Sequence, residues 1–160
     1  MLPSTARSLA EAFTLRATAT TLLLPASPDL RCMNLMCERA GQGCACRLSL
    51  SLERMPLLSH LDVSDNSLPQ LPDALFMLPR LRELRAPRNA LSSLPAALAG
   101  AALLEVLDLR WNAFATLPVA ALEALPALRE LNLEGNPLEE GARAALLASS
   151  LCARGAVRLE

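Results

Sequence analysis

The feature that most constrains the fold is a repeat of 23 to 24 residues in the middle of the chain. Four segments align, and their first residues lie 23, 23 and 24 positions apart: Leu58, Leu81, Leu104 and Leu128. Each segment reads L-x-x-L-x-(L/V/A)-x-x-N-x-(L/F), and the first three continue with x-x-L-P and further leucines. With such a period each repeat buries its apolar face only against its neighbours. We therefore expect a stack of similar units.

The two halves of each repeat predict different local structures. The first half alternates apolar and polar residues, which is typical of a short strand with one buried face. In the second half, leucines spaced at three and four residues after a proline are typical of a short helix or 3₁₀ turn. Stacking these units predicts a curved α/β solenoid, with a parallel sheet on its concave side and helical turns on its convex side.

An asparagine occupies the same position in every repeat. Four of the six asparagines of the chain lie there: Asn66, Asn89, Asn112 and Asn136. A buried amide at this position is able to donate to and accept from backbone groups of the adjoining turns. We expect the four to form a ladder along the stack, and the loss of one to cost about 1–3 kcal/mol.

Together, these leucines, asparagines and spacings resemble the leucine-rich repeat family. The resemblance is strong over residues 58–140, and the 23-residue L-P-x-x-L repeats look most like those of intracellular scaffold-type members. It implies a short horseshoe that binds proteins through its concave face. It also implies no catalysis and no required cofactor. We expect a small scaffold or assembly subunit of a larger complex in the cytoplasm.

The flanks of the four repeats predict caps. Residues 141–160 depart from the repeat and predict a longer closing helix with three apolar residues: Ala145, Leu146 and Leu151. Residues 30–57 predict a degenerate first repeat, with a loop at 38–47 pushed out of it and Glu38 in place of the ladder asparagine. Its strand is expected to use three apolar positions: Leu30, Met33 and Leu35.

Residues 1–29 leave two alternatives open. Four apolar residues fall on one helical face and predict an amphipathic helix that covers the end of the core: Leu2, Ala6, Leu9 and Phe13. The many Ser and Thr residues, with Glu11 as the only acid before Asp29, also form a weak mitochondrial transit pattern. No secretory signal is expected. The longest uncharged apolar run, around 94–104, is far shorter than the roughly 20 residues that span a bilayer, so we expect no membrane insertion.

Charge and residue usage exclude several functions. A formal net charge of −1 argues against direct nucleic-acid readout, which needs a basic excess. The chain has one histidine, His60, and no lysine, so no nucleophile and base pair is indicated. The G-Q-G stretch lacks the strand and the third glycine of a phosphate-binding loop. We expect no enzymatic activity.

A cysteine cluster is the one motif that could carry chemistry outside the repeats. It comprises Cys32, Cys37, Cys44 and Cys46, spaced C-x₄-C-x₆-C-x-C. We expect reduced, partly buried thiols and no metal, with a zinc site and disulfides as the alternatives. The alternative function is a zinc-binding or redox-sensing protein in which the repeats are a support.

The concave face provides the predicted binding site. In-register stacking makes residues at equal repeat positions lateral neighbours, and it brings arginines and the only tryptophan together on the two central repeats. Arg and Trp are the types most enriched at binding hot spots. The predicted protein-binding residues are Arg85, Arg88, Arg110, Trp111, Asp62, Asp108 and His60. The alternative is that Trp111 only covers leucines at the strand edge.

Overall fold

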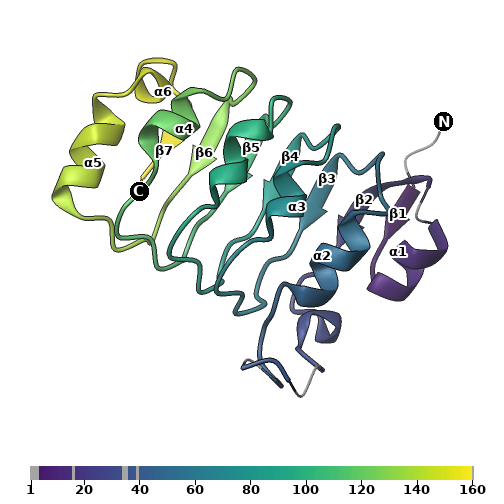
Figure 1. Ribbon diagram of the computed structural model, residues 1–160. Helices are drawn as coiled ribbons and strands as arrows, with labels where there is room; N and C mark the ends of the chain where they lie inside the picture. Colours follow the sequence, from purple (N-terminus) through teal and green to yellow (C-terminus); the bar gives the residue numbers. More distant parts are fainter. Residues whose placement is uncertain (1–3, 16, 34–35, 39, 160) are drawn as a thin grey trace.

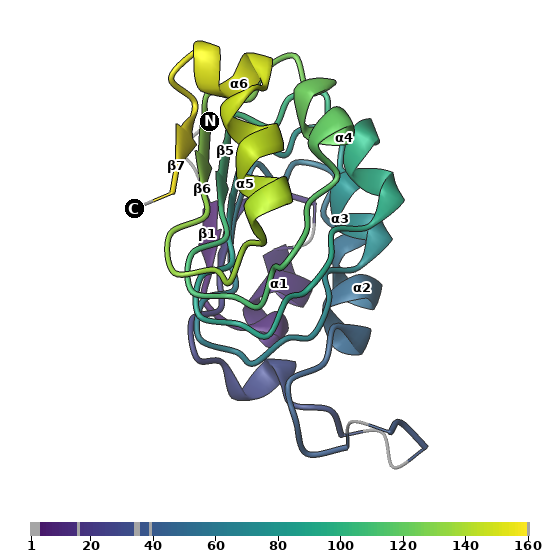
Figure 2. The same ribbon diagram turned by 90° about the vertical axis from the view of Figure 1, so that its left-hand side faces the viewer.

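The computed structural model describes residues 4–15, 17–33, 36–38 and 40–159 of the 160-residue chain. Its strands form one seven-stranded sheet in chain order, and every neighbouring pair is parallel. Figure 1 shows the helices following one another along one side of this sheet, and Figure 2 shows the two layers from the end. The predicted α/β solenoid of repeated strand and helical turn is confirmed. We call the side of the sheet opposite the helices the concave face.

The strands are short, as the alternating half-repeats predict. They span Ser4–Ala6 (β1), Ala19–Leu23 (β2), His60–Asp62 (β3), Glu83–Arg85 (β4), Val106–Asp108 (β5), Glu130–Asn132 (β6) and Val157–Arg158 (β7). In the repeats, Leu61 pairs with Leu84, which pairs with Leu107. This register buries one leucine column in the core and turns its neighbours, such as Asp62 and Arg85, to the concave face.

The helical elements are also short. They span Leu9–Leu15 (α1), Pro28–Leu30 (η1), Cys46–Leu52 (α2), Asp73–Phe76 (α3), Ala96–Gly100 (η2), Val119–Glu123 (α4), Glu140–Leu147 (α5) and Ser150–Ala153 (α6). Pro72, Pro95 and Pro118 occupy the N-cap positions of α3, η2 and α4, with φ between −71° and −77°. Proline already has the φ that the first turn requires, so these helices start where the L-P pair stands.

The core is aliphatic and continuous through the stack. Leucines of every repeat are fully buried, and Phe76 and Phe114 are its largest buried side chains. The four ladder asparagines lie between consecutive turns, where their side chains bind backbone groups. Asn112, for example, donates to the carbonyl oxygens of Ala86 and Leu109, both at 2.9 Å, and accepts from the N–H of Leu91 at 3.0 Å.

The predicted N-terminal helix is present as α1, but it is shorter than the apolar pattern indicated. Residues 4–23 form a strand, a helix and a second strand, so this segment adds sheet to the stack. Ala6 lies in β1, and α1 buries Leu9 and Ala12 while Phe13 is 56% exposed. Leu2 lies outside the described residues. The helical pattern fails here because Ala6 lies in strand β1, whereas Leu9 and Phe13 lie in helix α1.

The predicted strand of the first repeat is also misplaced. Its strand is β2, where Leu22 pairs with Leu61, and Leu30 belongs instead to η1. Met33 is 77% exposed and Leu35 lies outside the described residues. The equivalent of the ladder asparagine is Ser27, whose N–H donates to the Asn66 Oδ1 at 2.8 Å, and not the exposed Glu38.

The physical reason is an insertion longer than expected. The segment between η1 and α2 leaves the stack and projects from both layers (Figure 2), so the strand lies far upstream of the helix that completes its repeat. That helix, α2, was located correctly by its leucines, since Leu48 and Leu52 are fully buried.

The C-terminal end is closed by α5, α6 and β7. Leu146 and Leu151 are buried as expected of a cap, whereas Ala145 is exposed. The strand β7 was not predicted; its Val157 pairs with Leu131 and extends the sheet by one strand.

Candidate functional site on the concave face

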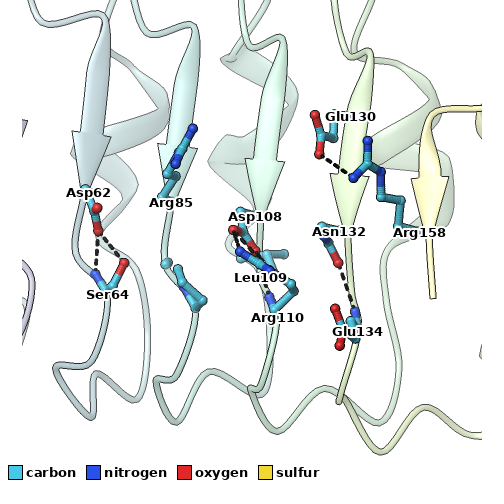
Figure 3. A network of polar contacts seen from close by, with 12 residues as sticks. Asp62, Ser64, Arg85, Asp108, Leu109, Arg110, Glu130, Asn132, Glu134 and Arg158 are labelled. Carbon is cyan, nitrogen blue, oxygen red and sulfur yellow. Dashed lines mark hydrogen bonds and ion pairs between the residues drawn. The ribbon is translucent and has the colours of Figure 1, made fainter. Parts of the chain in front are cut away.

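A turn recurs at the lower end of three strands (Figure 3). The side chain of the last strand residue accepts a hydrogen bond from the N–H two residues later: Asp62 from Ser64 at 2.9 Å, Asp108 from Arg110 at 3.2 Å, and Asn132 from Glu134 at 3.2 Å. Asp and Asn are the residues that form such turns. Asp62 and Asp108 were predicted as binding residues. In the structure their carboxylates accept hydrogen bonds from the backbone of their own turns.

The second repeat departs from this turn in both partners. Arg85 takes the place of the acceptor, and a guanidinium has no acceptor atom. Pro87 takes the place of the donor, and proline has no N–H. The turn therefore loses a donor and an acceptor together and leaves no backbone group unpaired there. The side chain of Arg85 instead pairs with Glu83.

Several charged groups of the predicted site form ion pairs within the chain. Nε and Nη2 of Arg110 lie 2.8 to 3.2 Å from the two carboxylate oxygens of Asp108. The hydrogen bonds to Asp108 raise the pKa of Arg110 above its usual value. The side chains of Arg82 and Glu105 pair across neighbouring repeats, and His60 lies 3.7 Å from Glu83.

The residues just before Ser27 and before the four ladder asparagines form a row with left-handed backbone. Their φ angles run from 47° to 71°: Ala26, Asp65, Arg88, Trp111 and Gly135. Such angles are uncommon for side chains with a Cβ and rare for bulky ones. The row forms the rim between the concave face and the ladder turns, and Trp111 is its largest member.

Trp111 is half-exposed, and its indole ring lies on the backbone of Gly135. The side chain is 52% exposed. A Cβ built on Gly135 would lie only 2.5 Å from the indole carbon Cε3, so a residue with a side chain would displace the ring. Trp111 therefore lies outside the core, and the absence of a side chain at Gly135 in the next repeat leaves room for its ring.

The remaining predicted residues lie around this rim and along the sheet. Arg88 is exposed over 68% of its side chain, with Asp65 at 3.8 Å as its ion-pair partner. A shallow hollow of about 240 Å³ lies on β2 to β4, where His60, Glu83 and Arg85 are joined by Thr21 and Leu23. Sequence analysis missed Thr21 and Leu23 because it did not place β2 in the sheet. It also missed Arg158 of β7, which lies 3.6 Å from Glu130.

The four cysteines of the cluster converge at the other end of the stack. Their Sγ atoms all lie within 4.8 Å of one another, although they are spread over fifteen residues of the chain. Cys32 and Cys44 are buried, and Cys46 is exposed. Burial, followed by the hydrogen bond to Cys46, raises the pKa of the Cys44 thiol.

Among the described residues, no helix is both long and apolar enough to cross a bilayer.

Three solved structures share this fold. A leucine-rich repeat protein of Leptospira interrogans is 26% identical, with a TM-score of 0.62, over 69% of this chain and 27% of that one. The BIR2 ectodomain of Arabidopsis thaliana is 31% identical, with a TM-score of 0.50, over 56% and 48%. Internalin C2 of Listeria monocytogenes, at 19% identity and a TM-score of 0.60 over 91% and 64%, shows the fold alone.

The chain thus has the fold of a leucine-rich repeat protein. It spans less than two thirds of each of the three structures. Neither a scan against protein-family models nor a search of curated protein sequences gives a match. The leucine-rich repeat fold is generally a protein-interaction module and is typically non-enzymatic.

Proposed function

We propose that this chain binds a protein partner through its concave face and the adjoining rim, with Trp111 and Arg88 as the principal contacts. It would act as a small scaffold or assembly subunit of a larger complex. We place it in the cytoplasm, with the mitochondrion as the alternative compartment.

The observation that carries the proposal is the position of the indole. Trp111 is bulky, its backbone lies in the left-handed region at φ 55°, and about half of its surface faces solvent. The core does not use it, since Leu109 and Phe114 fill the interior of the same repeat. A ring held against Gly135 has little freedom left to lose on binding, which is what makes an aromatic contact strong.

The ion pairs refine the chemistry of the partner. Asp108 compensates the charge of Arg110, and Glu83 that of Arg85, so these two guanidinium groups attract a further carboxylate less strongly. Arg88 is more accessible and lies in the same row as Trp111. A suitable partner therefore presents an apolar or aromatic side chain to the indole and a carboxylate to Arg88.

The test compares two exposed aromatic residues. The partner is captured from native extract with the wild-type chain and identified, and its affinity is then measured for wild type, Trp111→Ala and Phe13→Ala. Phe13 is the matched control because it is 56% exposed but lies on α1, away from the concave face. A hot spot of about 2 kcal/mol predicts roughly 30-fold weaker binding for Trp111→Ala. Equal affinities for wild type and Trp111→Ala would contradict the proposal.

A further inference from the structure

The cysteine cluster lies on the segment that leaves the stack between η1 and α2. Among its described residues, Met33 is 77% exposed and Met36 is 93% exposed. The side chains that are buried in this described part belong to Cys32, Cys44 and Ala45. Apolar burial therefore contributes little to the position of these residues.

Backbone hydrogen bonds fix the relative position of the cysteines. The N–H of Cys32 donates to the carbonyl of Gln42 at 2.8 Å, and the carbonyl of Cys32 accepts from Gly41 at 2.7 Å. The N–H of Cys44 donates to the carbonyl of Leu30 at 2.8 Å. The two arms of the segment thus run side by side, and the backbone hydrogen bonds alone bring their thiols together.

At Gly43 the same segment comes back into contact with the stack. A Cβ built on Gly43 would lie 2.0 Å from the carbonyl oxygen of Asn66 and 2.8 Å from that of Ser67. Only glycine fits between the segment and the ladder turn of the next repeat. The cluster is therefore built against the solenoid, with Cys46 contributed by the first turn of α2.

The spacing of the thiols fits one tetrahedral ion. With Zn–S bonds of about 2.3 Å, the sulfurs of a tetrahedral site lie about 3.8 Å apart. Here the Sγ of Cys44 lies 3.9 Å from that of Cys37, close to this value, and no pair in the cluster exceeds 4.8 Å. The Sγ atoms of Cys44 and Cys46, 2.8 Å apart, must separate by about 1 Å when the ion binds. An iron–sulfur cluster would hold its cysteines farther apart, because sulfide-bridged irons stand between them.

We propose that Cys32, Cys37, Cys44 and Cys46 form a structural Zn²⁺ site that holds this segment to the first full repeat. Four thiols release four protons, and the bound Zn²⁺ with four thiolates carries a net charge of −2. Arg31 and Arg47 flank the outermost ligands in the sequence, and Arg47 also pairs with Asp29. With four protein ligands the site is closed, so its role is to stabilise the fold and not to bind a substrate.

The experiment measures metal in the full-length protein. Elemental analysis of the purified chain is expected to find one zinc per molecule in wild type and in Cys152→Ser. Cys152 is the matched control, since it is the only cysteine outside the cluster and lies in α6. Cys46→Ser and Cys44→Ser are expected to lose most of the zinc; Cys46 is exposed, so its replacement leaves the packing intact.

A second measurement does not depend on the variants. Wild-type protein stripped of metal and given Co²⁺ is expected to show the charge-transfer and visible bands of a tetrahedral thiolate site. Its thermal midpoint is expected to rise when one equivalent of Zn²⁺ is restored. Bound iron in place of zinc, a mass lower by two hydrogens for each disulfide, or absence of zinc with all five cysteines titratable as thiols would each overturn the proposal.

Discussion

The ladder allows one perturbation to be worked out in detail. Asn112 is 8% exposed and its side chain makes four hydrogen bonds, to the carbonyls of Ala86, Leu109 and Arg110 and from the N–H of Leu91. Replacement by alanine removes all four at once. The cost depends on which of these backbone groups find another partner.

Three of these four backbone groups retain another hydrogen-bond partner. The carbonyl of Ala86 still accepts from Asn89, and that of Leu109 still accepts from Asn136. The carbonyl of Arg110 still accepts from the N–H of Arg88. Only the N–H of Leu91 is left without an acceptor, and Leu91 is fully buried, so water does not reach it easily. An orphaned amide costs about 1–3 kcal/mol, and the three shared bonds add a smaller amount. We expect Asn112→Ala to lose about 3 kcal/mol.

Asn132 is the matched control because it is also 8% exposed but makes one hydrogen bond, from the N–H of Glu134. Asn132→Ala is expected to lose at most about 1 kcal/mol. Urea unfolding followed by circular dichroism and by Trp111 fluorescence measures both variants, and the thermal midpoint of Asn112→Ala should fall by roughly 6–12 °C. Equal losses for Asn112→Ala and Asn132→Ala would refute the ladder argument, because burial alone would then account for both.

Two further substitutions test the rim. Gly135→Ala combines a strained φ of 71° with a Cβ 2.5 Å from the indole, so we expect a loss of about 2 kcal/mol and stronger acrylamide quenching of Trp111. In a Trp111→Ala background the loss should shrink to about 1 kcal/mol, and an unchanged loss would show that ring and glycine are not in contact. Asp108→Asn keeps an acceptor for the N–H of Arg110, as Asn132 has for its own turn, but removes the ion pair. We expect a loss of at most about 1 kcal/mol that becomes smaller in high salt, and a loss unaffected by salt would contradict the ion-pair explanation.

The central repeats could be predicted because their pattern is local and periodic. The spacing of Leu61, Leu84 and Leu107 determines strand, register and core face together, since a shift by one residue would expose the whole leucine column. The prolines before α3, η2 and α4 likewise mark the starts of the helical turns.

The first units could not be predicted in the same way. Ser27 replaces the asparagine, and a long segment separates β2 from α2, so neither the ladder residue nor the spacing identifies the strand. Only pairing with β3 reveals that Leu22 is the equivalent of Leu61. A local pattern does not contain that long-range contact.

The predicted site was located by residue type, whereas its chemistry depends on contacts. Lateral neighbours follow from the register, but the sequence does not show that Asp108 binds both Arg110 and its own turn. It also does not show that Gly135 supports the indole. In the second repeat, Arg85 and Pro87 together indicate that the turn lacks its hydrogen bond, and this signal could have been read from the sequence once the turn was known.

The most direct test of the proposed function uses the fluorescence of Trp111. It is the only tryptophan in a chain without tyrosine, so the emission of the chain reports on the rim, and the same titration of Trp111→Ala measures the emission of the partner itself. The purified partner is titrated against the chain, and emission and acrylamide quenching are measured at saturation. If the partner covers the indole, emission shifts to shorter wavelength and quenching falls. Binding that leaves emission and quenching unchanged would contradict a contact at Trp111.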